Sequence, residues 1–246
     1  MMFQKEQIDY LQKHFHTSTQ FTIDLNKIQS VEELFDPVIC KTYLQQISKE
    51  FNTTSLLVVA SQFAKRYASM LAPATLYAMS VYHTGLPVNP QNCYIKSAYE
   101  HGIWFPKLVL ANWESSELKQ DRHVWREKIV KQLFMNLSQM WTVLQKTTKI
   151  QPTILWENTA VYIHWLYQQQ LADHLQAQND YRYLLQASEE VFNTSFQPLQ
   201  RFPMNNGCRK TCCLYFLTNE TKQVCKGCPR AKANITQAKV RSVVTS

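Results

Sequence analysis

Glycine is scarce in this chain of 246 residues, which has only Gly85, Gly102, Gly207 and Gly227. No two of them have the spacing of a Gly-x-Gly-x-x-Gly dinucleotide-binding loop or of a Walker A loop. Those loops need glycine because their backbone must approach a phosphate closely. The sequence therefore predicts no dinucleotide or nucleoside-triphosphate site. If the protein carries out redox chemistry, we expect its electrons to come from another protein.

Long apolar runs are also absent. The longest, Leu56–Ala60, is interrupted by Ser61 and Gln62, whereas a membrane-spanning helix needs about 20 consecutive apolar residues. We therefore expect no transmembrane segment, which leaves peripheral membrane contact open. The stretch Met1–Gln7 has no basic start followed by an apolar run, so no secretory signal peptide is expected. Both absences favour a cytoplasmic protein.

Acidic residues are nearly missing from the C-terminal part of the chain. Residues 1–200 carry equal numbers of basic and acidic side chains, whereas residues 201–246 contain nine basic residues and one acidic residue, Glu220. The whole net charge of +8 therefore lies there. This excess either offsets the negative charge of a nearby group or steers an anionic partner toward the segment. Nucleic acid is not expected as that partner, because no nucleic-acid-binding motif accompanies the basic residues.

Cysteine is rare before residue 200, where only Cys40 and Cys93 occur, and is dense afterwards. Five cysteines follow within a short segment: Cys208, Cys212, Cys213, Cys225 and Cys228. Such a group indicates disulfides, structural zinc or an iron–sulfur cluster. A cytoplasmic location disfavours disulfides. The Cys-Lys-Gly-Cys turn fits a zinc knuckle, but the adjacent pair fits zinc poorly because paired zinc ligands are usually two to four residues apart. A dinuclear cluster uses an adjacent pair more easily, so zinc and iron–sulfur both stay open on spacing alone.

The stretch Cys212-Cys213, eleven residues, then Cys225-Lys226-Gly227-Cys228-Pro229, preceded by Arg209, resembles the C-terminal motif of the FhuF-type siderophore-iron reductases. In that family the motif is Cys-Cys-x10-Cys-x2-Cys and holds a 2Fe–2S cluster. The extra spacer residue here lies in the polar loop Thr218–Thr221. A looser similarity is Leu155-Trp156-Glu157-Asn158, which resembles a Leu-Trp-x-Asn segment in the family's middle helices.

The resemblance implies a cytoplasmic protein that reduces the Fe(III) of a ferric siderophore by one electron and releases Fe(II), which hard oxygen donors bind less tightly. It implies Cys212, Cys213, Cys225 and Cys228 as ligands of a 2Fe–2S cluster. Cys208 lies outside the motif, either as a spare thiol near the cluster or as a replacement ligand after damage to a neighbour. A ferredoxin- or flavodoxin-type protein would donate the electrons. Nearby basic side chains would tune the cluster's potential or steer partners: Arg209, Lys210, Lys226, Arg230 and Lys232. Two alternatives belong to other classes, a non-catalytic zinc-binding interaction module and a 2Fe–2S redox sensor or assembly protein without a siderophore substrate.

Hydrophobic periodicity predicts a predominantly helical α+β fold with a small antiparallel element. The expected helices cover residues 3–15, 37–51, 55–71, 74–83, 121–146, 152–172 and 178–191. Pro73 is expected to end or kink the third helix. Residues 93–110 predict a β-hairpin in which Gly102 supplies positive φ and Pro106 marks an edge position, and Phe21–Leu25 predicts a short strand. We expect residues 1–200 to form the helical body and the basic segment 201–246 to pack on it within one domain.

Single residues carry three further predictions. Asp36 is expected to cap the helix that starts at Pro37, and Cys40 on the apolar face of that helix is expected to be buried. Asn158 lies on an apolar helix stripe, either as a core asparagine with satisfied hydrogen bonds or as a polar contact that faces a pocket. The seven histidines show no metal-binding spacing.

Overall fold

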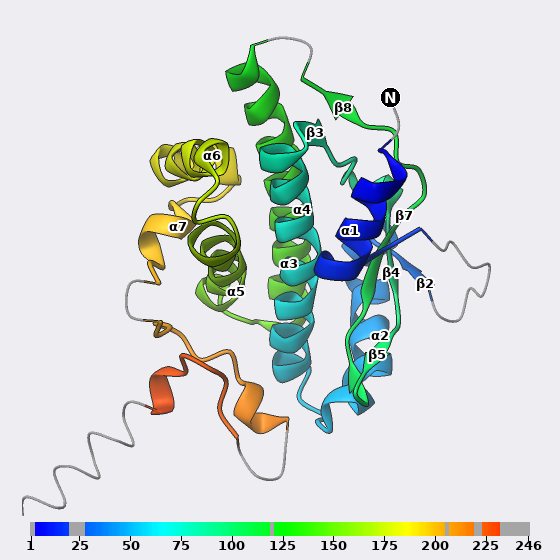
Figure 1. Ribbon diagram of the computed structural model, residues 1–246. Helices are drawn as coiled ribbons and strands as arrows, with labels where there is room; N and C mark the ends of the chain where they lie inside the picture. The colour runs from blue at the N-terminus through cyan, green and yellow to red at the C-terminus, as the bar shows by residue number, and fades with distance from the viewer. Residues whose placement is uncertain (1–2, 20–27, 119–120, 205–206, 219–222, 232–246) are drawn as a thin grey trace, which may run out of the picture.

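The computed structural model describes residues 3–19, 28–118, 121–204, 207–218 and 223–231. They form a predominantly helical α+β fold with a small sheet, which confirms the predicted fold class. Figure 1 shows two long helices, α3 (Leu56–Val81) and α4 (Arg122–Thr148), side by side at the centre. The sheet lies on one side of this pair with α1 and α2, and α5 to α7 lie on the other side.

Helix α3 is the core element. Of the residues from Val58 to Ser80, all but Lys65 are buried. The helix does not end at Pro73, and the separate helix predicted over 74–83 is wrong, because α3 continues through this residue to Val81. A proline inside a helix removes one backbone hydrogen bond and costs about 3 kcal/mol. Burial of apolar side chains on every face of α3 outweighs this cost, so tertiary packing overrides the local preference.

The N-terminal helices confirm two predictions. Helix α1 spans Lys5–Phe15, and α2 spans Pro37–Ile47 between the short 3-10 helices η1 (Glu33–Phe35) and η2 (Ser48–Phe51). Asp36 caps α2 as expected, since its Oδ1 accepts hydrogen bonds from the N–H groups of Val38 (2.7 Å) and Ile39 (3.1 Å). Cys40 is buried on the inner face of this helix.

The helices on the other side are α5 (Pro152–Trp165), the π-helix η4 (Leu166–Gln170), α6 (Leu175–Gln186), the 3-10 helix η5 (Glu189–Phe192) and α7 (Pro198–Arg201). The helix predicted over 178–191 starts earlier, because the His174 ring accepts the N–H of Ala177 (3.2 Å) at its start. It also ends earlier, at Gln186, and η5 follows as a separate turn.

The sheet has the strand order β1-β7-β4-β2, in which β1 runs parallel to β7 and the other pairs are antiparallel. Its strands are β1 (Thr17–Ser18), β2 (Ile28–Ser30), β4 (Cys93–Lys96) and β7 (Lys107–Leu110). Two further short pairs are β3 (Thr84–Gly85) with β8 (Ser116–Glu117), and β5 (Tyr99–Glu100) with β6 (Ile103–Trp104). The 3-10 helix η3 (Pro90–Asn92) precedes β4.

The hairpin predicted over residues 93–110 is confirmed. Strands β4 and β7 pair antiparallel, β5 and β6 extend them, and the turn has positive φ at His101 (+50°) and Gly102 (+76°). Pro106 lies between β6 and β7, where the ladder is interrupted, and β7 itself is an inner strand, so the predicted edge position is wrong. The strand predicted at Phe21–Leu25 lies outside the described residues.

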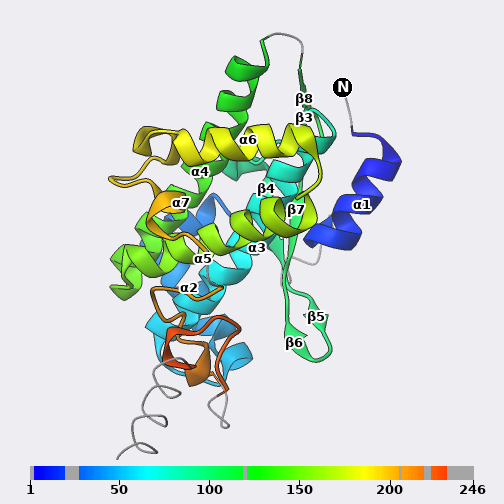
Figure 2. The same cartoon turned by 60° about the vertical axis from the view of Figure 1, so that its left-hand side comes forward.

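The C-terminal segment, described at residues 207–218 and 223–231, lies at the end of the molecule where α3 begins (Figure 1). Its 3-10 helix η6 (Tyr215–Leu217) contacts α3. The hairpin of β5 and β6 projects at the same end, as the turned view shows (Figure 2). Among the described helices, none is both long and apolar enough to cross a membrane.

Candidate metal centre

The two halves of the cysteine motif meet in the fold. The Sγ atoms of Cys213 and Cys225 lie 3.3 Å apart. Cys213 and Cys228 are buried, whereas Cys212 and Cys225 are partly exposed. All four are free thiols. The fold therefore brings one cysteine of each half into contact, and each half has one buried and one partly exposed cysteine.

A tight turn forms the second half of the motif. The N–H of Cys228 donates a hydrogen bond to the carbonyl oxygen of Cys225 (3.1 Å), and Gly227 has a φ of +78°. Glycine adopts this left-handed conformation without steric cost. The N–H of Arg209 donates to the Gly227 carbonyl (2.8 Å), which joins this turn to the segment before the first half.

Helix α3 holds the first half through one carbonyl group. The carbonyl oxygen of Cys213 accepts hydrogen bonds from Ser61 Oγ (2.7 Å) and Gln62 Nε2 (2.6 Å). Directly after it, Leu214 has a φ of +62°, uncommon for a residue other than glycine. In this conformation the Leu214 N–H points at the Sγ of Cys212 (3.4 Å). The backbone around the adjacent cysteines is therefore fixed on one side by a buried helix.

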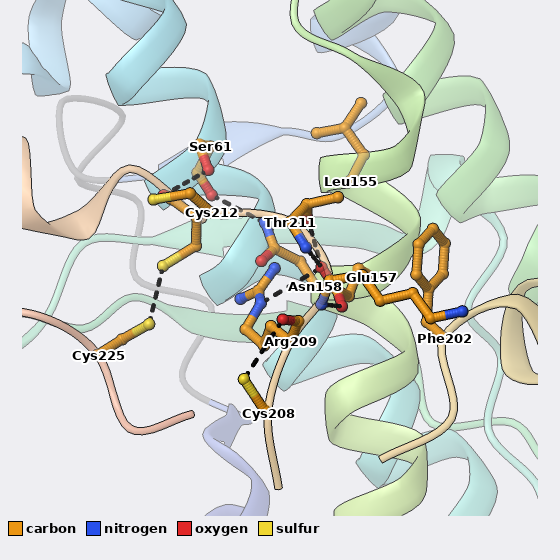
Figure 3. A network of polar contacts seen from close by, with 12 residues as sticks. Ser61, Leu155, Glu157, Asn158, Phe202, Cys208, Arg209, Thr211, Cys212 and Cys225 are labelled. Carbon is orange, nitrogen blue, oxygen red and sulfur yellow. Dashed lines mark hydrogen bonds and ion pairs between the residues drawn. The ribbon is translucent and has the colours of Figure 1, made fainter. Parts of the chain in front are cut away.

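Helix α5 holds the same half through a buried carboxylate, as Figure 3 shows. The side chain of Glu157 accepts hydrogen bonds from the N–H of Lys210 (2.5 Å), from the N–H of Thr211 (2.7 Å) and from the Thr211 hydroxyl. The Nε of Arg209 lies 3.6 Å from the same carboxylate, and both side chains are almost fully buried. Three consecutive residues before the adjacent cysteines are thus anchored to one glutamate.

Positive charge surrounds the sulfurs. Hydrogen bonding between the two thiols lowers the pKa of Cys213 to about 5, against the opposing effect of burial and with further help from Arg209 and Lys65; the same bond raises the pKa of Cys225. Burial lowers the pKa of Lys65, while the two sulfurs act to raise it. Its Nζ lies 5.5 Å from the centre of the Tyr215 ring. The thiolate form is therefore favoured at Cys213, whereas burial raises the pKa of Cys212, and the nearby cationic groups favour negative charge on the sulfurs.

Two residues singled out by the sequence lie beside the centre without facing it. The ammonium of Lys210 donates to the carbonyl oxygen of Arg201 (2.7 Å). The thiol of Cys208 is half-buried and lies 3.6 Å from the carbonyl oxygen of Arg209. Lys210 helps to anchor the segment through its backbone N–H, which donates a hydrogen bond to Glu157.

The basic residues expected to steer partners lie on the outside of the cysteine turn. Arg230 is exposed, with its guanidinium 4.2 Å from the centre of the Phe216 ring. Lys226 is exposed as well. Lys232 lies outside the described residues.

Asn158 follows the anchoring glutamate and is completely buried between α5 and α3. Its Nδ2 donates to the carbonyl oxygen of Ser61 (3.3 Å). Its Oδ1 has no hydrogen-bond partner among the described residues. It is therefore a core asparagine with one half of its amide satisfied, and its bond to Ser61 ties α5 to the stretch of α3 that holds Cys213.

One cavity lies away from the cysteines. It has a volume of about 810 Å³ and is lined by α4 together with η1, η3 and their neighbours, including Glu32, Gln91, Glu127, Lys131 and Met135. None of its lining residues belongs to α3, to α5 or to the cysteine segment. This cavity is therefore not part of the cysteine centre.

Four residues of the centre were missed by the sequence reading: Ser61, Gln62, Lys65 and Glu157. Glu157 carried a usable signal, because a charged residue on an apolar helix stripe is rarely buried without a partner. Ser61, Gln62 and Lys65 carried no such signal, because nothing in their spacing along α3 distinguishes them from other residues of a helix. What selects them is the direction from which the cysteine segment approaches, and this depends on the whole fold.

A 2Fe–2S cluster or another thiolate-bound metal can be tested against these residues. The four cysteines of the two halves supply the donor type that such clusters need. Arg209 is buried, and its Nη2 has no hydrogen-bond partner in the described part of the chain, so an acceptor such as a cluster sulfur fits there. Among the described residues, no three ligating side chains already converge on one point. By donor chemistry and charge, the residues fit the cluster.

Comparison with known proteins identifies the body of the chain. The family model of the ferric iron reductase FhuF-like transporters matches residues 61–208, well over half of the chain. The match starts at Ser61 on α3 and ends at Cys208, so it includes the anchoring residues of α3 and α5 but stops before Cys212. No curated protein matches the chain.

Proposed function

Because this chain belongs to the FhuF-like ferric iron reductase family, we propose that it reduces the Fe(III) of a ferric siderophore by one electron and so releases iron in the cytoplasm. The electron would pass through a 2Fe–2S cluster held by Cys212, Cys213, Cys225 and Cys228. The observation that carries the proposal is the 3.3 Å contact between Cys213 and Cys225, which joins the two halves of the motif on the family-matched body. Fe(II) leaves the siderophore because hard oxygen donors hold it less tightly than Fe(III).

The chain's own residues would do three things in this reaction. Ser61 and Gln62 fix the backbone at Cys213, so that the inner thiolates have a defined position. The partly exposed Cys212 and Cys225 form the side that a substrate can approach. Lys65, together with the other basic groups around the sulfurs, favours the additional negative charge of a reduced centre.

An external protein would supply the electrons. The sequence has no glycine-rich nucleotide-binding loop, and a ferredoxin- or flavodoxin-type donor delivers single electrons, which matches a one-electron reaction. The exposed basic residues Lys226 and Arg230 provide a complementary surface for an acidic donor or an anionic ferric siderophore.

Metal analysis of protein purified without oxygen from iron-replete cells tests the cofactor. We expect two irons and two sulfides per chain and a visible absorbance band. Stoichiometric zinc without iron would instead favour an interaction module. Turnover of ferric siderophores with a reduced donor and an Fe(II)-trapping chelator tests the reaction. A stable cluster without such turnover would favour a redox sensor or assembly protein.

A further inference from the structure

The buried ion pair between Glu157 and Arg209 is an unusual way to attach a C-terminal segment. Both side chains lie almost completely inside the protein, where an ion pair stabilises a fold weakly because desolvation offsets most of the attraction. A pair of apolar side chains would hold the segment against α5 at least as well. The charges therefore suggest a role in addition to attachment.

We infer that Glu157 is a positioning residue for the cysteine centre. It fixes the position and orientation of the adjacent pair Cys212-Cys213 relative to α5. Its negative charge also holds the guanidinium of Arg209 near the sulfurs. This inference rests on the proposed function for its meaning in the reaction. The positioning itself follows from contacts that are present without any bound group.

The acceptor geometry accounts for the carboxylate. Glu157 receives two backbone N–H groups and one hydroxyl from residues 210 and 211, and it faces the Nε of Arg209. All of these are donors, so the position needs a side chain that only accepts. A glutamine of the same shape would turn its NH2 group toward a donor and leave at least one N–H without an acceptor, which is unfavourable away from water.

The guanidinium of Arg209 supplies the electrostatic part. The buried guanidinium lies close enough to Cys213 and Cys225 for its charge to act on both sulfurs, and its Nη2 has no hydrogen-bond partner among the described residues. Glu157 carries the opposite charge and offsets that of Arg209 from 3.6 Å away. Removing the negative charge of Glu157 should therefore raise the reduction potential of the centre, because negative charge disfavours the reduced form. Removing the positive charge of Arg209 should lower the potential, because positive charge favours the reduced form.

The first experiment uses the full chain without metal. Hydrogen exchange is measured at the amides of Lys210 and Thr211, whose N–H groups donate hydrogen bonds to Glu157. We expect Glu157→Gln to exchange faster at these amides by at least tenfold. The matched control is Asp180→Asn, because Asp180 is also a completely buried carboxylate paired with arginines, Arg122 (2.7 Å) and Arg126 (3.2 Å), but it touches none of the residues of the cysteine segment that are described. Asp180→Asn should leave the exchange at 210 and 211 unchanged.

The second experiment is a redox titration of the loaded protein followed by visible absorbance. We expect Glu157→Gln to raise the midpoint potential and Arg209→Gln to lower it, while Asp180→Asn leaves it in place. Unchanged exchange and potential in Glu157→Gln would overturn the inference, as would equal changes in Asp180→Asn. If Glu157→Gln does not fold, Thr211→Val removes one donor and should give a smaller change of exchange in the same direction. A wild type that never takes up a cluster would defeat the proposed function, but the exchange experiment would still decide the positioning role.

Discussion

Gly227 lies so close to Gly207 that a Cβ atom on Gly227 would be 2.2 Å from the Gly207 carbonyl oxygen. No real side chain tolerates that distance to a backbone atom, so one of the two chain segments would have to move. Gly227 belongs to the turn between Cys225 and Cys228, and Gly207 directly precedes Cys208. The two glycines therefore allow the second half of the cysteine motif to pack against the chain that leads into the first half.

This close approach predicts the effect of Gly227→Ala. The substitution should separate the two halves of the motif and strongly reduce the iron content, measured as iron per chain after anaerobic purification. Gly102→Ala is the matched control, because Gly102 has nearly the same positive φ of +76° but no heavy atom within 4 Å of the added Cβ. Both variants share the strain of positive φ, about 1–2 kcal/mol. Equal iron content in the two variants would show that the approach of Gly207 is unimportant.

The cysteines themselves give the second prediction. Replacing any one of Cys212, Cys213, Cys225 or Cys228 by serine should remove most of the bound iron and the visible absorbance. Cys208→Ser should retain both, because the Cys208 thiol lies against the Arg209 carbonyl outside the motif. Loss of the cluster in Cys208→Ser alone would mean that the assignment of the four ligands is wrong.

The sequence predicted the elements whose information is local. The Asp36-Pro37 start of α2, the hairpin turn at Gly102 and the long helix α4 all follow from capping, turn chemistry or periodicity. The prediction that the helix ends at Pro73 was wrong, because the favourable packing of α3 comes from helices far away in the sequence. Similarly, the length of α6 depends on the His174 cap and on a turn of 3-10 helix, which periodicity does not register.

For the candidate site, the sequence predicted four cysteine ligands but not the residues that hold their backbone in place. The spacing of the four cysteines and the basic composition of residues 201–246 are visible in the chain itself. The anchoring by Ser61, Gln62 and Glu157 is not, because these residues are about 50 to 150 positions away from the cysteines they hold. Only the docking of the segment across α3 and α5 brings them together.

The scarcity of glycine leads to the third prediction, on electron supply. The pure protein should not oxidise NADPH at a measurable rate, and it should reduce ferric siderophores once a reduced ferredoxin- or flavodoxin-type donor is added. Absorbance of NADPH and of an Fe(II) chelate report the two processes separately. Stoichiometric NADPH oxidation by the protein alone would contradict this.

His164 gives the fourth prediction, on stability and pH. Its ring is buried between the Tyr181 hydroxyl (2.5 Å) and the Phe202 carbonyl oxygen (3.0 Å), and burial lowers its pKa. An unfolded histidine has a pKa near 6.5, so as the pH falls below this value the unfolded chain binds the proton first. The free energy of unfolding should therefore decrease as the pH falls from 7 to 5.

Urea denaturation at both pH values measures this dependence. The decrease should be smaller in His164→Gln, which keeps an amide in the same place but does not titrate. The exposed His123 serves as the control, and His123→Gln should keep the pH dependence of the wild type. An identical dependence in wild type and His164→Gln would exclude this histidine as the cause.

The basic C-terminal segment gives the last prediction, on association rate. The whole net charge of +8 lies in residues 201–246, and Lys226 and Arg230 are exposed beside the cysteines. The Debye length shrinks from about 30 Å at 0.01 M salt to about 10 Å at 0.1 M, so steering of an anionic siderophore or acidic donor should weaken with salt. Neutralising Lys226, Arg230 and Lys232 to glutamine should lower the second-order rate of electron transfer and flatten its salt dependence.

Two controls separate steering from a change in the centre itself. Lys5 and Lys13 are exposed on α1, which lies on the other side of α3 from the C-terminal segment (Figure 1). Neutralising these two lysines should leave the salt dependence of the rate unchanged. The midpoint potential of the triple variant must be measured as well, because loss of nearby positive charge lowers the potential and slows the reaction without any steering. The absorbance should change little, since none of the three residues is a proposed ligand. A wild-type rate that does not vary with salt would mean that these charges only offset the negative charge of the centre.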